Sequence, residues 1–259
     1  MTSSDRLDPA YGRSPTNRSL ERGMDVLLSF RPGWTVQGNA EIAERTGLSR
    51  ATVSRLAQTL VRKGLLQVEP RSRQYRLSPA VLGLAFAMRS GSALLQAAQP
   101  PMQELAHKLG VNVGLASADG LDMVYLESVR HNRRAALRQV LSGQRIPMEL
   151  TSLGRAHLAD LPDRERKPLL AGFRARRASQ WAVLGAEIEA AMASVDSQGY
   201  CLASWQPGVV ALATPLRWAH ERYALNLSLS GVERLAASER RSLARHLLAL
   251  KQRIVQAAP

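Results

Sequence analysis

The sequence predicts an α+β fold in which a small helical head with a two-stranded wing precedes a larger antiparallel sheet flanked by helices. Residues 39–62 have the spacing of a helix-turn-helix, and two short strand-like runs around a basic turn follow them directly. Beyond residue 110, apolar runs of strand length alternate with turn signals and helical patterns. The 259 residues suffice for two domains.

Residues 1–18 are polar and contain two prolines, so we expect a flexible arm there. Ser19 is expected to cap a helix that ends near Phe30, before Arg31-Pro32-Gly33. The apolar residues expected to face inward on this helix are Leu20, Met24, Leu27 and Leu28.

The helix-turn-helix rests on three residues at fixed spacing. Ala43 permits close approach of the second helix, Gly47 suits a left-handed turn, and Val53 fills the angle between the helices. Ser49 is a natural N-cap for the second helix. Val53, Leu56, Ala57 and Leu60 recur at helical spacing and should point inward, with Ile42 and Leu48 completing the core. The opposite face carries Arg50, Ala51, Ser54, Arg55 and Gln58.

Gly64 ends the second helix, and residues 65–69 and 74–77 are predicted strands around a tight turn. The turn contains Arg71 and Arg73, so it is either a wing that contacts nucleic acid or an ordinary exposed loop. Guanidinium, hydroxyl and amide groups on the outer face of the second helix suit base edges and phosphates in a major groove.

Residues 81–88 are apolar on every side of a predicted helix, which requires burial all round. We expect this helix to pack against a second subunit, with an intrachain core as the alternative. The run is too short to cross a bilayer. A short helix over 93–98 should precede a new helix that starts at Pro100-Pro101 and ends at Gly110.

The remaining segments predict a sheet with flanking helices. Ala118-Asp119-Gly120 is a hairpin turn between two strands. Predicted strands are 111–117, 123–129, 137–141, 199–202, 209–214 and 224–230, and predicted helices are 152–159, 163–173, 186–197 and 238–257.

Charge and composition limit the function classes. The formal charge is +14, but residues 1–80 contribute 13 − 7 = +6 and the rest 22 − 14 = +8, so basicity alone does not locate a nucleic-acid site. A single cysteine and a polar N-terminus without an apolar segment indicate a soluble cytoplasmic protein. The histidines are scattered, Cys201 has no evident partner, and no phosphate-binding glycine loop occurs, so we expect no metal, no cofactor and no catalysis.

From Ser19 onward the chain resembles the IclR family of bacterial transcription regulators. The matching runs are SLERGMDVLLSF, AEIAERTGLSRATVSRLAQTLVRKGLL and QYRLSPAVLGLAFAM. The resemblance implies a winged helix-turn-helix domain over 19–78, linker and dimerisation helices over 79–99, and a GAF/profilin-like effector-binding domain over 100–259. It also implies a homodimer that can form a tetramer as a dimer of dimers. Its partners would be double-stranded DNA with a palindromic operator and a small-molecule effector, with no membrane involved.

The resemblance implies an effector cavity bordered by the loop before helix 152–159. The run GYCLASWQPGVVALATPL departs from the family pattern, since Ala203 and Ser204 replace acidic residues and Ala211 replaces a cysteine, whereas Ser228 and Ser230 match. The ligand is therefore aromatic and stacked near Trp205, or held by backbone and the two serines, or absent. Candidate contacts are Leu115, Met148, Leu150, Ser204, Trp205, Ala211, Ser228 and Ser230, for which core packing is the alternative.

The sequence thus predicts a sequence-specific DNA-binding regulator controlled by a small organic effector. Its DNA contacts would be Ser49, Arg50, Ala51, Ser54, Arg55, Gln58, Arg71 and Arg73. The competing class is a non-specific architectural DNA-binding protein, which would bind specific and random sequences equally.

Overall fold

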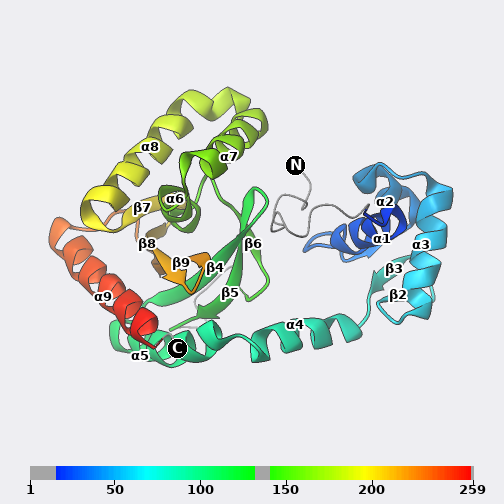
Figure 1. Cartoon of the computed structure of the whole chain (residues 1–259), viewed down its shortest axis with the longest axis horizontal. Helices are drawn as coiled ribbons and strands as arrows, with labels where there is room; N and C mark the ends of the chain where they lie inside the picture. The colour runs from blue at the N-terminus through cyan, green and yellow to red at the C-terminus, as the bar shows by residue number, and fades with distance from the viewer. Residues whose placement is uncertain (1–15, 132–140, 258–259) are drawn as a thin grey trace. The chain divides into compact units, whose positions relative to one another are not determined.

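The computed structural model describes residues 16–131 and 141–257, which form two compact units (Figure 1). Within the described residues, the N-terminal unit contains 16–91 and the C-terminal unit contains 92–131 and 141–257. The predicted linker segment 79–99 is divided between the two units, because its first helix belongs to one and its second to the other.

The N-terminal unit is a three-helix core with a small sheet. Its helices are α1 (Arg18–Leu28), α2 (Asn39–Thr46) and α3 (Arg50–Arg62), and its strands are β1 (Val36–Gln37), β2 (Leu66–Val68) and β3 (Tyr75–Leu77). The antiparallel strand order is β1-β3-β2. The predicted inward residues of α3 are confirmed, since Val53, Ala57 and Leu60 are buried and Leu56 packs against them.

The predicted orientation of α1 is wrong for three of its four residues, and only Leu27 of the four packs against the core. Val26 is fully buried, whereas Leu20, Met24 and Leu28 are exposed. A small core reaches only one side of α1, and that side is defined by contact with α3 rather than by the largest apolar residues. The cap also differs from prediction, because the Asn17 side chain, not Ser19, accepts from the first backbone N–H groups.

Helix α4 (Ala80–Ser90) has no buried residue in the described chain. Its large apolar side chains are strongly exposed, with Leu82 and Phe86 both at 72%. Burial all round therefore does not occur within one copy, and burial against a second copy stays a prediction. None of the described helices has by itself both the length and the apolar composition of a membrane span; α4 and the helix after it reach them only as a bent pair.

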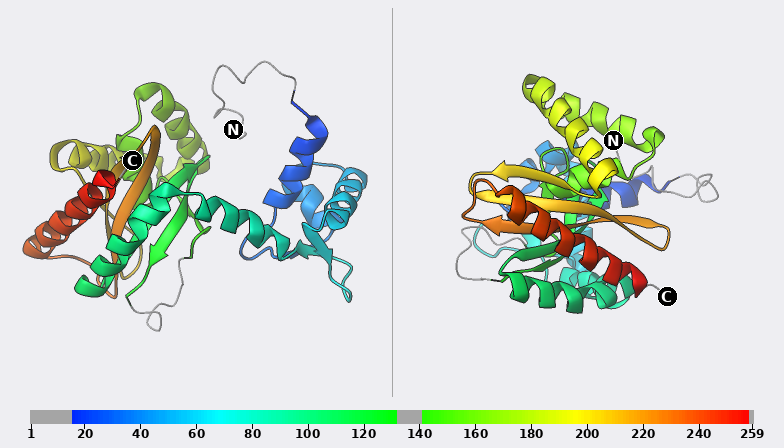
Figure 2. Two further views of the ribbon diagram at one scale, coloured as in Figure 1. Left: turned by 60° about the horizontal axis from the view of Figure 1, so that its bottom comes forward. Right: turned by 90° about the vertical axis from the view of Figure 1, so that its left-hand side faces the viewer.

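A six-stranded antiparallel sheet forms the centre of the C-terminal unit (Figure 2). The strand order is β6-β5-β4-β9-β8-β7. The strands are β4 (Asn112–Asp119), β5 (Asp122–Val129), β6 (Arg145–Pro147), β7 (Cys201–Gln206), β8 (Val209–Trp218) and β9 (Glu221–Ser230). Hairpin β4–β5 was predicted, whereas the short edge strand β6 was not.

Helices cover both faces of this sheet. In the right-hand view of Figure 2, α5 (Ala93–Leu109) and α9 (Ala237–Gln256) lie on one side of it. The other side carries α6 (Ser152–Ala159), α7 (Asp163–Arg176) and α8 (Trp181–Gln198), whose buried residues share one core, and the short η2 (Ala178–Gln180) connects α7 to α8. Two separate hydrophobic clusters result, one on each face. A sheet covered on both faces buries alternate residues in different cores.

In this unit the predicted helix start at Pro100 is wrong, and a predicted strand lies mostly outside the described residues. Helix α5 runs unbroken through Pro100 and Pro101, although we expected a new helix there. The apolar face that continues across the prolines from Leu95 to Leu105 packs on the sheet, and this burial offsets the missing backbone hydrogen bonds. Most of the predicted strand 137–141 lies outside the described residues.

Candidate functional site

The helix-turn-helix geometry follows from three local features. Gly47 ends α2 with a left-handed backbone at φ 69°, a conformation that a side chain would strain. The Ser49 hydroxyl accepts a hydrogen bond from the Thr52 backbone N–H at 3.2 Å, which caps α3. Buried Val53 then holds α3 against the rest of the unit. These contacts fix which side of α3 faces outward.

The outer side of α3 carries the predicted DNA contacts. Arg50, Ala51, Arg55 and Gln58 are exposed, and Ser54 is half-buried. The helix contains no aspartate or glutamate. Within the described part of the chain, neither Arg50 nor Arg55 forms an ion pair through its guanidinium group, so both positive charges remain available to a partner.

The turn between β2 and β3 presents two more arginines. Arg71 and Arg73 are exposed, and Arg73 adopts a left-handed backbone at φ 58°. The Arg73 backbone N–H donates to the Glu69 carbonyl at 2.9 Å, which closes the turn. The turn therefore holds both guanidinium groups outside the small sheet.

The C-terminal unit contains a cavity of about 680 Å³ on the α6 side of the sheet. This volume lies in the range of small-molecule sites, roughly 300–1,000 Å³. Lining residues come from the start of α6, from all six strands of the sheet, and from the segments that follow β5 and β9, precede β6 and connect β7 to β8. They are Asn112, Tyr125, Arg130, Gln144, Arg145, Ile146, Thr151, Ser152, Leu153, Trp205, Gln206, Pro207, Gly208, Val209, Ala211, Asn226, Ser228, Ser230 and Gly231.

Four of the eight predicted effector residues line this cavity. They are Trp205, Ala211, Ser228 and Ser230. Pairing of β8 with β9 places Ala211 directly opposite Ser228. The pairing of β7 with β8 is irregular between Ala203 and Gln206, and Trp205 lies within this irregular segment. The Trp205 side chain lines the cavity and is 37% exposed. Ser228 and Ser230 of β9 therefore line the cavity, and their contact with an effector stays a prediction.

The other four predicted effector residues do not line the cavity. Leu115 is fully buried in the core on the opposite face of the sheet. Met148 and Leu150 pack into the core beneath α6. Ser204 is exposed, and its hydroxyl donates to the Val209 carbonyl at 2.7 Å. Apolar character alone did not distinguish the cavity wall from the two cores, because both faces of the sheet are covered.

Nine polar residues that line the cavity were not predicted, among them Asn112, Tyr125, Arg130 and Asn226. Asn226 precedes Ser228 and Ser230 at two-residue spacing, so strand alternation could have found it. Burial raises the pKa of Tyr125 to about 12, although a hydrogen bond with Asn226 opposes the shift. At neutral pH the Tyr125 phenol is therefore protonated and can donate.

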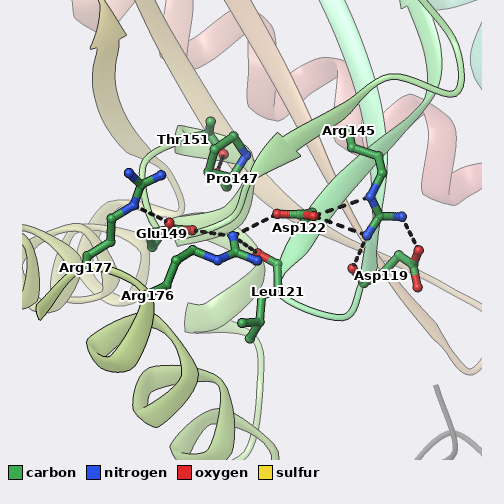
Figure 3. Close-up of polar contacts among 9 residues, drawn as sticks. All are labelled: Asp119, Leu121, Asp122, Arg145, Pro147, Glu149, Thr151, Arg176 and Arg177. Carbon is green, nitrogen blue, oxygen red and sulfur yellow. Dashed lines mark hydrogen bonds and ion pairs between the residues drawn. The ribbon is translucent and has the colours of Figure 1, made fainter. Parts of the chain in front are cut away.

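An ion-pair network fixes the wall of the cavity near α6 (Figure 3). Fully buried Glu149 accepts from Arg177 Nε at 3.0 Å and lies 3.6 Å from Arg176 Nη1. Arg176 also bonds Asp122 at 2.9 Å, and Asp122 in turn pairs with Arg145 at 3.3 Å. The end of α7 is thereby tied to the β4–β5 turn, to β6 and to the loop before α6.

Two further observations concern reactive groups. Cys201 is buried, and burial raises the pKa of its thiol to about 12, with Arg155 opposing. Among residues 16–131 and 141–257, no group of three or more histidine, cysteine, aspartate or glutamate side chains has metal-binding geometry.

Comparison with known proteins assigns both units. Residues 19–70 match the IclR helix-turn-helix domain, and residues 87–256 match the domain described as bacterial transcriptional regulator IclR C-terminal. The chain belongs to the IclR family of bacterial transcription regulators. The predicted family and α+β fold class are thus confirmed.

Individual IclR relatives agree with this assignment. The regulator TsaQ1/TsaQ2 of Comamonas testosteroni is 36% identical over 183 residues, covering 70% of this chain and 66% of that protein. An IclR family regulator from Brucella abortus has 32% identity and a TM-score of 0.86, with 96% of both chains covered. An IclR homologue of Microbacterium hydrocarbonoxydans, solved in complex with 4-hydroxybenzoate, shares the fold at 21% identity and a TM-score of 0.71, covering 92% of this chain and 98% of that one.

Proposed function

We propose that this IclR-type regulator binds a palindromic operator as a homodimer and responds to a small aromatic effector in the C-terminal cavity. The observation that carries the proposal is the cavity itself, which combines an apolar wall with convergent polar groups. A regulatory rather than catalytic use of the cavity agrees with the names of the relatives. Action on DNA would place the protein in the cytoplasm.

The proposed DNA contacts are the outer face of α3 and the wing. Arg50 and Arg55 are the principal candidates, because their guanidinium groups are exposed and the helix carries no negative charge. Ser49, Ala51, Ser54 and Gln58 support them on the same helix, and Arg71 and Arg73 would contact the backbone or the minor groove.

Arg55→Ala tests whether α3 reads sequence. If Arg55 forms a bidentate contact with guanine, the variant should lose about 1–3 kcal/mol of affinity for the selected operator and little for random DNA. The operator is first selected in vitro with the full chain, and affinities are then measured by fluorescence anisotropy at fixed salt. Arg164→Ala on α7, whose side chain is 85% exposed, is the matched control. Equal binding of operator and random DNA by the parent protein would support the architectural alternative instead.

A second copy of the chain is the proposed partner of α4. Leu82, Leu84, Phe86 and Met88 are between 53% and 72% exposed, so the helix presents apolar side chains without cover in one copy. A palindromic site also requires two recognition helices about 34 Å apart, which a two-fold dimer provides.

Phe86→Asp tests the dimer. A two-fold interface contains each phenylalanine twice, so loss of its burial should weaken association by about 3–6 kcal/mol. Sedimentation equilibrium of the full chain measures this directly, and it also distinguishes two copies from four. The control is Val183→Asp on α8, where the valine is 68% exposed. An unchanged dimer in Phe86→Asp, or a monomeric parent protein, would exclude α4 as the interface.

An aromatic effector fits the composition of the cavity. Trp205, Ile146 and Leu153 supply apolar surface, and Tyr125 and Asn226 supply hydrogen-bonding groups. The complex of the Microbacterium homologue with 4-hydroxybenzoate supports the same ligand class. Isothermal titration of the full chain with 4-hydroxybenzoate and 4-hydroxybenzamide should detect binding of at least one compound. Binding of neither would overturn the proposed effector class.

A further inference from the structure

Arg130 in the cavity wall has a buried guanidinium nitrogen, Nε, that is not hydrogen-bonded within residues 16–131 and 141–257. No carboxylate of the described residues lies within ion-pair distance of the Arg130 guanidinium. Burial accordingly lowers the pKa of Arg130. An unsatisfied, partly desolvated guanidinium costs free energy unless something else occupies the site.

The second guanidinium in the wall is already neutralised. Arg145 forms ion pairs with both Asp119 and Asp122 (Figure 3). Burial lowers the pKa of Arg145, but the hydrogen bonds and charges of the two aspartates outweigh burial and raise it. None of the described lining residues is an aspartate or glutamate. Arg130 is therefore the uncompensated positive charge among the described residues that line the cavity.

The sheet register places Arg130 beside other polar residues of the wall. Val129 pairs with Val113, so Arg130 follows at the level of Asn112. Asn112 pairs with Ser228, and Ser228 pairs with Ala211. A guanidinium just beyond β5, an amide on β4 and a hydroxyl on β9 thus lie at one level of the sheet, and all three residues line the cavity.

We infer that Arg130 is a specificity-determining residue that selects an anionic effector by pairing with its carboxylate, with Asn112 and Ser228 at the same level of the sheet. The guanidinium fork matches a carboxylate in two parallel hydrogen bonds. Small adjacent side chains such as Ala211 leave room for the rest of the ligand. This inference rests on the proposed effector function and adds the charge of the ligand and the residue that recognises it.

The test compares acids with their uncharged amides in the full chain. Benzoate and 4-hydroxybenzoate are titrated calorimetrically beside benzamide and 4-hydroxybenzamide. The parent protein should prefer each acid over its amide. Arg130→Gln should weaken binding of the acid by roughly 10- to 150-fold, the range for hydrogen bonds to charged groups, and change amide binding less than about threefold. Arg130→Lys keeps the positive charge but not the planar guanidinium, so its affinity for the acid should lie between those of the parent protein and Arg130→Gln.

The controls separate this inference from the effector proposal. Arg164→Gln, an exposed arginine on α7, should change neither affinity. An unchanged circular dichroism spectrum and retained amide binding show that Arg130→Gln is folded, and Arg130→Lys provides the test if it is not. Equal acid affinity in Arg130→Gln and parent protein would overturn the role of Arg130 and leave an aromatic effector in place. Preference of the parent protein for the amide over the acid would also overturn the role of Arg130. If the parent protein binds none of the compounds, both the role of Arg130 and the aromatic effector are excluded.

Discussion

Replacement of Gly154 by alanine should strongly destabilise the C-terminal unit. Gly154 lies in α6, and an added Cβ would stand 2.0 Å from the Met148 carbonyl oxygen and 2.5 Å from its carbonyl carbon. Ordinary contact begins near 3.4 Å, so the two backbones must separate by 3.4 − 2.0 = 1.4 Å. Backbone atoms, unlike the end of a side chain, cannot rotate away.

The magnitude follows from the bonds that this separation breaks. The Thr151 hydroxyl donates to the Pro147 carbonyl at 2.9 Å and caps the Gly154 N–H at 3.3 Å, and Arg155 Nε donates to the Glu149 carbonyl at 3.2 Å. Loss of two or three such bonds costs about 1 kcal/mol each, and overpacking adds about 1–3 kcal/mol. Alanine returns about 1 kcal/mol through helix propensity. The expected net loss is about 2–5 kcal/mol.

Gly185→Ala is the matched control, because it makes the same substitution in helix α8. The nearest atom to its added Cβ is in the Trp181 ring at 3.5 Å, an ordinary contact. This variant should therefore gain about 0.5–1 kcal/mol from helix propensity. Urea unfolding followed by tryptophan fluorescence compares the two, since Trp181, Trp205 and Trp218 all lie in the C-terminal unit. A Gly154→Ala variant within 1 kcal/mol of the parent protein would refute the close packing of α6 on the Met148 backbone.

Two further predictions concern buried charge and the thiol. Arg177→Leu should cost about 3 kcal/mol of unfolding free energy, because it leaves the fully buried Glu149 carboxylate with only the 3.6 Å contact to Arg176. Glu149→Gln should lower the free energy of unfolding less than Arg177→Leu does, since the partly exposed side chains of Arg176 and Arg177 can be hydrated. A larger loss for Glu149→Gln than for Arg177→Leu in urea unfolding would contradict this account. Cys201 should resist Ellman's reagent at pH 8 in the folded protein and react at once in urea, because burial raises its pKa from 9.0 to about 12 and keeps the thiol protonated. Because the thiol ionises at lower pH in the unfolded chain than in the folded protein, the contribution of Cys201 to the free energy of unfolding should be lost as pH rises above about 9. Rapid labelling of the folded protein would instead show that the thiol is accessible.

Local patterns in the sequence determined much of the fold. The left-handed glycine at 47, the cap at Ser49 and the helical spacing of Val53 and Ala57 all act within a few residues, so they specify the helix-turn-helix without knowledge of the rest. Helix α6 was likewise predicted at its observed bounds, 152–159. Ser228 and Ser230 were predicted from the resemblance to the family and placed on the last strand, and both lie on β9.

Only the tertiary structure decided which residues form the cavity. Because helices cover both faces of the sheet, the apolar pattern of β4 does not tell which face borders the cavity, and Leu115, a predicted effector contact, lies in the core on the other face. A register shift between Leu115 and Ala116 sets the level of Arg130 across the sheet, and no local pattern reports such a shift. The exposure of Leu20 and Phe86 depends in the same way on what packs beside them. Periodicity identifies a buried face, whereas its partner is fixed by contacts between segments far apart in the chain.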